Sequence, residues 1–186
     1  MVCIAATLLV FGLSFVAGCG NSGKAETPQG NAGGVIGTSR GLVDPGTLLT
    51  RAEAEAALGE QVKEPDLKDT KNPLGQKICF YAPVSDQSGK FIQISVVQNE
   101  GMGKSLREQG YNVAQLYNET QKNLTDAKPV PGIGDEAFWG TNGLHILKGN
   151  VYLTISVGST SRPENLEMAK RLAEKAVSRL GGAPGS

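Results

Sequence analysis

Hydrophobic and polar positions divide the chain into stretches with different patterns. The first, Cys3 to Gly18, carries no charge and consists mostly of Ile, Leu, Val, Phe and Ala. The second, residues 19–46, contains eight glycines with Ser, Asn, Pro and Gln and shows no apolar periodicity. The third alternates between strand-like and helix-like patterns. We therefore predict one folded domain at 47–181, preceded by a flexible tether at 19–46 and followed by a disordered tail at 182–186.

Two helices are predicted from capping residues and apolar spacing. Thr50 and Glu53 have the spacing of a capping box and Gly59 is a typical stop, so a short helix is expected at about 51–58. A longer helix is expected at about 164–180, where apolar residues recur every three or four positions. Those residues are Leu166, Ala169, Leu172, Ala173, Ala176, Val177 and Leu180.

Strand patterns separate these helices. Ile92, Ile94 and Val96 alternate with polar residues, which is typical of a half-buried strand. Strands are expected at 78–82, 91–98, 136–139, 144–147 and 151–157. A third helical pattern covers 104–124, but Gly110 lowers the helix propensity within it, and its first half is also compatible with a loop.

The end of the first stretch, Val16-Ala17-Gly18-Cys19, resembles the lipobox of bacterial lipoproteins. The apolar run before Cys19 is about sixteen residues long, whereas a bilayer-spanning helix needs roughly twenty. The resemblance implies a signal peptide at 1–18, cleavage between Gly18 and Cys19, and acyl chains on Cys19. The chain departs from the family pattern in having no Lys or Arg before Ser14. An ordinary secretory signal or an uncleaved anchor is the alternative.

Lipid attachment at Cys19 implies a location and a first partner. Two or three acyl chains make membrane attachment effectively permanent, so we expect a cell-envelope protein held at a membrane. Gly20, rather than Asp, after the cysteine resembles proteins sent to the periplasmic side of the outer membrane in Gram-negative cells.

The order strand, strand, helix occurs twice in the folded part. An internal duplication is our explanation, and chance similarity of strand patterns is the alternative. Two such units predict an α+β fold with an antiparallel sheet and helices packed on one face. The element order is similar in outline to the PsbP-like fold of several small bacterial lipoproteins. That resemblance concerns element order only and implies no residue role.

Charge and cysteine content narrow the function. The chain has 18 basic and 18 acidic residues, which excludes the basic footprint of a nucleic-acid-binding protein. Cys79 has no internal disulfide partner once Cys3 leaves with the signal and Cys19 is acylated. Gly132 and Gly134 follow a Pro-Val-Pro segment rather than a strand, so they do not fit a dinucleotide fingerprint, and no cofactor is expected.

Few side chains are candidates for chemistry. His145 is the only histidine, and we expect a packed or exposed strand residue. A zinc or copper ligand acting with Cys79 or nearby carboxylates, or a hydrolase site with Asp135, is the alternative. Cys79 between Ile78 and Phe80 is more typical of a core thiol than of a redox centre. The carboxylates of Glu53, Glu55, Asp135 and Glu136 are expected on the solvated surface.

Three aromatic residues are the best candidates for a ligand groove, namely Tyr81, Trp139 and Tyr152. Phe138 and Trp139 must point to opposite faces if both lie in one strand, so one of them is expected to face outward. Simple packing under a helix is the alternative. The sequence thus favours a lipid-anchored, non-catalytic domain that binds a protein or a small apolar ligand or organises partners. The alternative is an envelope hydrolase or metal-binding protein that uses His145.

Overall fold

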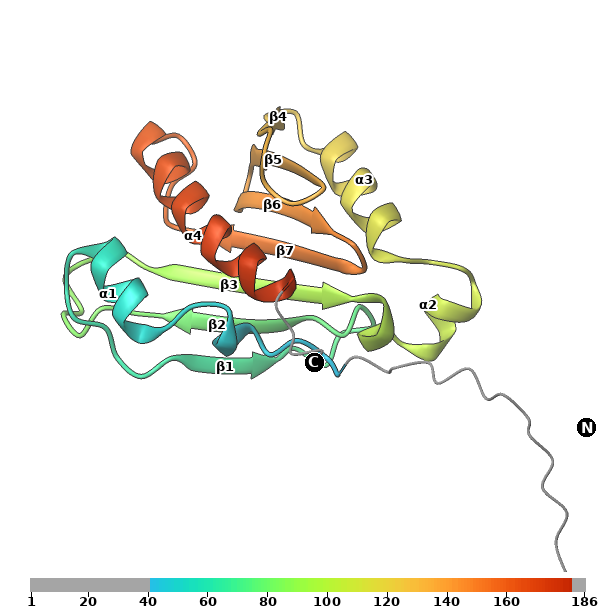
Figure 1. Ribbon diagram of the computed structural model, residues 1–186, viewed down its shortest axis with the longest axis horizontal. Coiled ribbons are helices and arrows are strands. Elements are labelled where there is room, and N and C mark those ends of the chain that lie inside the picture. The colour runs from blue at the N-terminus through green and yellow to red at the C-terminus, as the bar shows by residue number, and fades with distance from the viewer. Residues whose placement is uncertain (1–40, 182–186) are drawn as a thin grey trace, which may run out of the picture. The chain divides into compact units, whose positions relative to one another are not determined.

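Within residues 41–181, which the computed structural model describes, seven antiparallel strands form one sheet in the order β1-β2-β3-β7-β6-β5-β4 (Figure 1). The strands are β1 Asp66–Asp69, β2 Lys77–Tyr81, β3 Ile92–Gln98, β4 Lys128–Pro129, β5 Glu136–Gly140, β6 Gly143–Lys148 and β7 Val151–Ser156. The predicted α+β class is confirmed. The predictions for residues 1–40, including cleavage after Gly18 and lipid attachment at Cys19, and the predicted tail at 182–186 lie outside the described residues.

The five predicted strands correspond to β2, β3, β5, β6 and β7. The two outermost strands, β1 and β4, are additional. All four residues of β1 and both residues of β4 are exposed, so no alternation of buried and exposed positions marks them in the sequence. The pairing of β3 with β7 joins two meanders, β1–β3 and β4–β7, at the centre of the sheet.

The helices in the described part of the chain are α1 Arg51–Leu58, α2 Lys104–Glu108, α3 Val113–Asn123 and α4 Pro163–Gly181. The capping box of Thr50 and Glu53 is present at the start of α1, and Gly59 ends that helix with a φ of 72°. The third helical pattern is divided into α2 and α3, because Gly110 has a φ of 76°, a backbone conformation that interrupts a helix.

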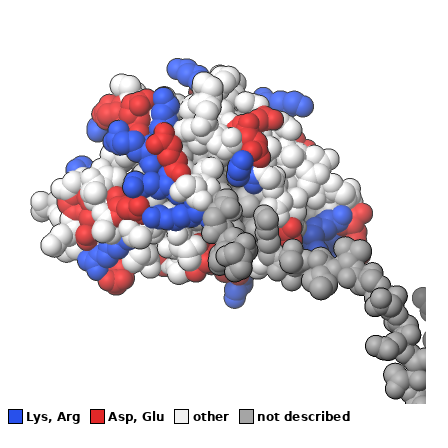
Figure 2. Space-filling model, viewed as in Figure 1, with Lys and Arg blue, Asp and Glu red and all other residues white. Residues whose placement is uncertain are grey.

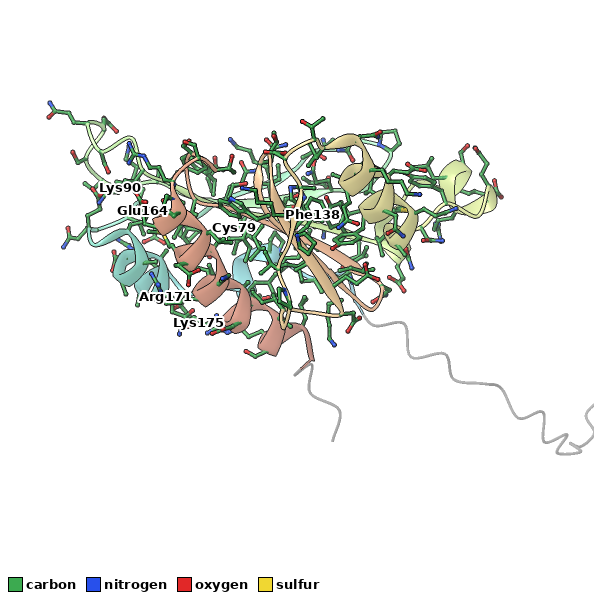
Figure 3. The ribbon with its side chains drawn as sticks, turned by 90° about the horizontal axis from the view of Figure 1, so that it is seen from above. Cys79, Lys90, Phe138, Glu164, Arg171 and Lys175 are labelled. Atoms are coloured by element: carbon green, nitrogen blue, oxygen red, sulfur yellow. The ribbon has the colours of Figure 1, made fainter. Side chains whose placement is uncertain are left out.

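The helices cover both faces of the sheet, so the expectation that they lie on one face is wrong for α3. We call the face under α1 and α4 the closed face and the face under α3 the groove face; Figure 3 shows α3 and α4 on opposite sides of the sheet. The reason is that β5–β7 are apolar on both faces. Ile146 and Leu153 are buried in the cluster of the closed face, whereas Leu147 and Tyr152 are buried in the cluster of the groove face.

The arrangement of α3 and α4 does not fit an internal duplication. A two-fold axis that relates the antiparallel neighbours β3 and β7 runs perpendicular to the sheet and would place both helices on the same face. In addition, the second predicted strand pair, β5 and β7, is separated by β6. The repeated element order therefore reflects two meanders followed by helices that pack differently.

The packed domain begins earlier than residue 47. The Val43 backbone N–H donates to Oε1 of Gln98 at 2.5 Å. Pro45 is buried in a short 3-10 helix, η1, Pro45–Thr47, which Asp44 caps through a bond from the Gly46 N–H. The last residues assigned to the tether are therefore part of the folded domain.

An ion-pair cluster joins α1 to α4 on the closed face. The Arg179 guanidinium donates to both carboxylate oxygens of Glu53, at 2.7 and 2.9 Å, and Lys175 lies 3.2 Å from the same carboxylate. These contacts, Arg179 first, lower the pKa of Glu53 to about 2. The expectation that Glu53 is simply solvated is wrong, because the fold brings two cations of a distant helix to it.

Acidic and basic side chains are interspersed over the surface around α1 and α4 (Figure 2). No helix within residues 41–181 combines the length and apolar character that crossing a bilayer requires.

Candidate binding groove

A groove of about 670 Å³ lies on the groove face, beside α3 and over the central strands β3 and β7. Its volume falls within the range of roughly 300–1,000 Å³ that is typical of small-molecule sites. The groove is open to solvent and is lined by residues of several separate segments of the chain. It is therefore the first candidate for a functional site.

The groove exists because one helix cannot cover this sheet. Seven strands at about 4.8 Å spacing span roughly 29 Å, whereas a helix with its side chains is roughly 10 Å wide. On the groove face α3 packs against β6 and β7. In residues 41–181 no helix has comparable contacts with β2 or β3 on that face, and the surface over β3 and β7 is hollow.

The floor consists of three directly opposed residue pairs of β3 and β7. Gln93 lies opposite Ser156, Ser95 opposite Thr154, and Val97 opposite Tyr152. The residues between them on each strand, such as Ile94 and Ile155, point to the closed face and are fully buried there. Strict alternation along the two strands thus separates a polar floor from an apolar core.

The walls come from segments that are distant in the sequence. Leu116 and Thr120 of α3 form one side, and Leu74, Gln76 and Phe91 belong to segments next to β2 and β3. Asn142, in the turn before β6, and residues 158–160, before α4, also line the groove. Phe91 stacks on Phe80, with ring centroids 5.6 Å apart, and both rings are half-buried.

Among the described residues that line the groove there is no Lys, Arg, Asp or Glu. The lining is instead made of amides, hydroxyls, one imidazole and a few apolar side chains. Two buried hydroxyls of the floor are anchored: Ser95 accepts a bond from Gln76 Nε2 at 2.7 Å, and Ser156 donates to the Asn142 carbonyl. The groove is therefore polar but electrically neutral.

His145 and Tyr152 form a buried pair at the side of the groove next to α3. His145 Nε2 lies 2.8 Å from the Thr141 carbonyl and His145 Nδ1 lies 2.7 Å from the Tyr152 hydroxyl. A carbonyl only accepts, so Nε2 carries the proton and Nδ1 accepts from Tyr152. The ring stacks on Phe138 at a centroid distance of 4.4 Å. Burial lowers the pKa of His145, which favours the neutral form of the imidazole.

This geometry bears on the chemistry expected of His145. Both ring nitrogens are engaged, so metal binding or proton abstraction would first require one of these hydrogen bonds to break. The negative charge of Asp126 partly opposes the effect of burial on the pKa of His145. Its carboxylate, however, accepts a hydrogen bond from the Thr141 hydroxyl at 3.1 Å, whereas the His145 ring donates to the Thr141 carbonyl. Within residues 41–181 no group of three or more His, Cys, Asp or Glu side chains has the arrangement of a metal site.

The three aromatic residues expected to form a groove do not meet. Only Tyr152 lines the groove. Tyr81 is fully buried in the cluster of the closed face, where its hydroxyl donates to the Leu49 carbonyl at 2.6 Å. Trp139 is buried in the same cluster and donates from Nε1 to the Thr160 carbonyl at 3.1 Å. As expected, Phe138 and Trp139 point to opposite faces, but both are buried: Phe138 packs against Tyr117 of α3, and Trp139 lies in the cluster of the closed face.

The remaining candidates have structural roles. Cys79 is a fully buried free thiol in the core of the closed face, and burial raises the pKa of its thiol. Asp135 accepts from Lys148 at 2.7 Å and from the Gly149 N–H at 2.7 Å, contacts that hold the pKa of its carboxyl below the ordinary value. Neither side chain lines the groove.

Sequence reasoning missed the polar floor. Gln93 and Ser95 belong to the alternating pattern that identifies β3, and Thr154 and Ser156 belong to the corresponding pattern of β7. Nothing in a strand pattern distinguishes polar residues that face bulk water from polar residues that line a hollow. The pairing of these two strands, which are more than fifty residues apart in the sequence, creates the floor.

Comparison of the chain with protein-family models, with curated proteins and with solved structures yields no significant match. The fold and the groove therefore define the class of the protein: an α+β domain with one apolar, helix-covered sheet face and one face that carries an open, neutral groove.

Proposed function

We propose that this chain is a lipid-anchored cell-envelope protein whose folded domain binds a ligand in the groove without transforming it. The observation that carries the binding role is the neutral polar floor of paired β3 and β7 side chains. Burial of such polar side chains under a helix would lower the stability of the fold, because they would lose their hydrogen bonds to water. A ligand with its own donors and acceptors replaces those hydrogen bonds when it binds.

The anchor in this proposal rests on the lipobox-like segment that ends in Gly18 and Cys19. Acyl chains on Cys19 would hold the domain at a membrane, on the periplasmic side of the outer membrane if the cell is Gram-negative. The charge balance of the chain, with 18 basic and 18 acidic residues, supports a covalent rather than an electrostatic attachment.

A hydrolase or metal-binding role for His145 has less support. General-base catalysis needs a ring nitrogen that is free to take a proton from a substrate, and His145 already accepts from Tyr152 through Nδ1. The described residues of the groove lining include no carboxylate or cysteine that would serve as nucleophile. The small apolar ligand expected from the three aromatic residues is also disfavoured, because two of them lie on the closed face.

The anchor is tested by mass spectrometry of the N-terminal peptide of the full chain extracted from membranes. We expect a peptide that starts at an acylated Cys19, and we expect Cys19→Ser to release the protein into the soluble fraction. Cys3→Ser, in the segment removed with the signal, is the control and should leave anchoring unchanged. An unmodified Cys19 still joined to Gly18 would contradict the anchor.

The binding role is tested by native mass spectrometry of the full chain purified from its cells in detergent. We expect a non-covalent adduct on the wild-type protein and its loss in Gln93→Trp, in which the indole fills the groove. Gln61→Trp places the same side chain at an exposed position outside the groove and should keep the adduct. Circular dichroism verifies that both variants fold. Absence of an adduct, or an equal adduct in both variants, would contradict the proposal.

A further inference from the structure

We infer that the groove takes a neutral, hydroxyl-rich ligand, of which an oligosaccharide is the natural class. This inference rests on the proposed function, since it names the ligand of the same groove. It follows from what the lining contains and from what each other class of ligand would require.

Charged ligands are disfavoured first. A carboxylate or phosphate is normally held by Arg, Lys or the N-terminus of a helix, and a cationic group by carboxylates. The lining contains no such side chain, and the two α3 residues in it, Leu116 and Thr120, belong to the second and third turns rather than to the N-terminus. A charge placed in this groove would lose hydration without gaining a partner.

Acyl chains and other apolar ligands are disfavoured next. Such a ligand would cover the Thr154 hydroxyl and the Gln93 amide of the floor without offering hydrogen bonds in return. Each buried polar group left without a partner costs about 1–3 kcal/mol, which offsets part of the gain from the apolar side chains of the lining. The floor therefore requires a ligand with its own donors and acceptors.

The groups that remain match hydroxyl-bearing ligands. Gln93 is half-buried and lines the groove, and its side-chain amide carries two donors and an acceptor that suit such a ligand. Thr154 is half-exposed on the same face of β7 as Tyr152 and adds a hydroxyl to the lining. Amides and hydroxyls both donate and accept, as sugar hydroxyls do.

Phe91 adds an apolar platform to this polar set. Its ring is half-buried, lines the groove and is held by stacking on Phe80 at 5.6 Å. Sugar rings carry one face of C–H groups, which packs on the flat face of an aromatic ring. A rigid ring next to amides and hydroxyls therefore suits a ligand that is apolar on one side and hydroxylated at its rim.

A peptide fits this groove less well. Extended peptides bind most often by adding a strand to a free sheet edge, where backbone groups provide the affinity. The floor strands β3 and β7 are paired on both sides, with β2, with each other and with β6, so no free edge opens into the groove. The backbone N–H and C=O groups of a bound peptide would have to form their hydrogen bonds with side chains of the groove alone.

The test uses the full chain in a sugar-free zwitterionic detergent and isothermal titration calorimetry. The probes are chitotetraose, cellotetraose and maltotetraose as neutral oligosaccharides, tetragalacturonate as a charged oligosaccharide, and acetyl-Gly-Ala-Gly-Ala-amide as a neutral peptide. We expect at least one neutral tetrasaccharide to bind with a higher affinity than tetragalacturonate or the peptide.

Variants locate the binding. Gln93→Leu and Thr154→Val each remove polar groups with little change of size, and each should weaken binding about tenfold, the effect of one hydrogen bond left unmade. Gln61→Leu outside the groove is the matched control and should bind like the wild type. Comparison of thermal unfolding ensures that a loss of affinity does not reflect a loss of fold.

The outcomes separate this inference from the proposed function. The inference is overturned if no neutral tetrasaccharide binds, if tetragalacturonate or the peptide binds more tightly, or if Gln93→Leu and Thr154→Val leave the affinity unchanged. In each of these cases a cellular adduct that Gln93→Trp abolishes would still support a binding role for the groove. Absence of any such adduct would overturn the proposed function itself.

Discussion

The two faces of the sheet are built from the same strands but differ in what covers them and in the polarity of their side chains. On the closed face, Ile94 and Leu153 are fully buried beneath α1 and α4, and an ion pair between Glu53 and Arg179 ties these helices together. On the groove face, α3 covers an apolar cluster around Phe138, while the neighbouring surface is hollow and polar. Most of the buried apolar residues lie on the closed face. The groove face can therefore expose polar side chains to a ligand at a smaller cost to the stability of the fold.

The strongest test of this difference between the two faces is a pair of substitutions at adjacent residues of β7. Leu153→Ala removes a fully buried side chain from the closed face and should lower the free energy of unfolding by about 3 kcal/mol. Thr154→Ala removes a half-exposed side chain from the floor of the groove and should cost less than about 1 kcal/mol. Urea unfolding measures both values. Similar losses in the two variants would show that the faces do not differ in this way.

Two buried tyrosines allow a second comparison, because Tyr81 and Tyr117 are both fully buried but on different faces. The Tyr81 hydroxyl donates to the Leu49 carbonyl on the closed face, so Tyr81→Phe should cost about 1–2 kcal/mol. The Tyr117 hydroxyl has no hydrogen-bond partner in the described part of the chain, so Tyr117→Phe should leave stability unchanged or raise it slightly. Thermal unfolding distinguishes the two, and a large loss in Tyr117→Phe would reveal a missed partner.

The link between α1 and α4 predicts a pH dependence. Because the pKa of Glu53 is about 2 in the folded state against an ordinary 4.5, its stabilising contribution is present above the ordinary value and is lost as the pH falls toward 2. Glu53→Gln keeps a side chain suited to the capping box but removes the charge. It should cost about 1 kcal/mol at pH 7, a value reduced by solvent screening, and almost nothing near pH 2. A cost independent of pH in urea unfolding would exclude this ion pair as its cause.

The neutral character of the groove is tested through the only histidine of the chain. Burial lowers the pKa of His145 from its ordinary 6.5, so protonation favours the unfolded state and stability should decrease as the pH falls below 6.5. NMR titration of the ring protons should give a midpoint below that of the urea-unfolded chain. A midpoint at or above the unfolded value would place a charge beside the groove and contradict its neutral character.

Local patterns predicted a large part of the fold. The alternation in β3 and the capping box of α1 depend on residues close together in the sequence, and the structure confirms both of them. The short edge strands β1 and β4 were missed because exposed residues leave no apolar period. The face covered by α3 was also missed, since continuous apolar runs in β6 and β7 do not tell which side a later helix will cover.

The candidate site was predicted less well than the fold. Of the three aromatic residues expected in a groove, Tyr152 lines it, whereas Tyr81 and Trp139 are core residues of the closed face. Their distribution between the two faces depends on strand register, because a shift of one residue moves a side chain from one face of the sheet to the other.

The sequence by itself determined which residues alternate, where α1 and α4 begin and end, and that the domain is an α+β protein, because these features depend on neighbours three or four positions apart. It also contains the lipobox-like segment on which the proposed anchor at Cys19 rests. Only the tertiary structure decided that β3 pairs with β7, that α3 covers the opposite face from α4, and that Gln93, Ser95, Thr154 and Ser156 form one floor. Such contacts join segments more than fifty residues apart, and the packing of the whole chain selects them.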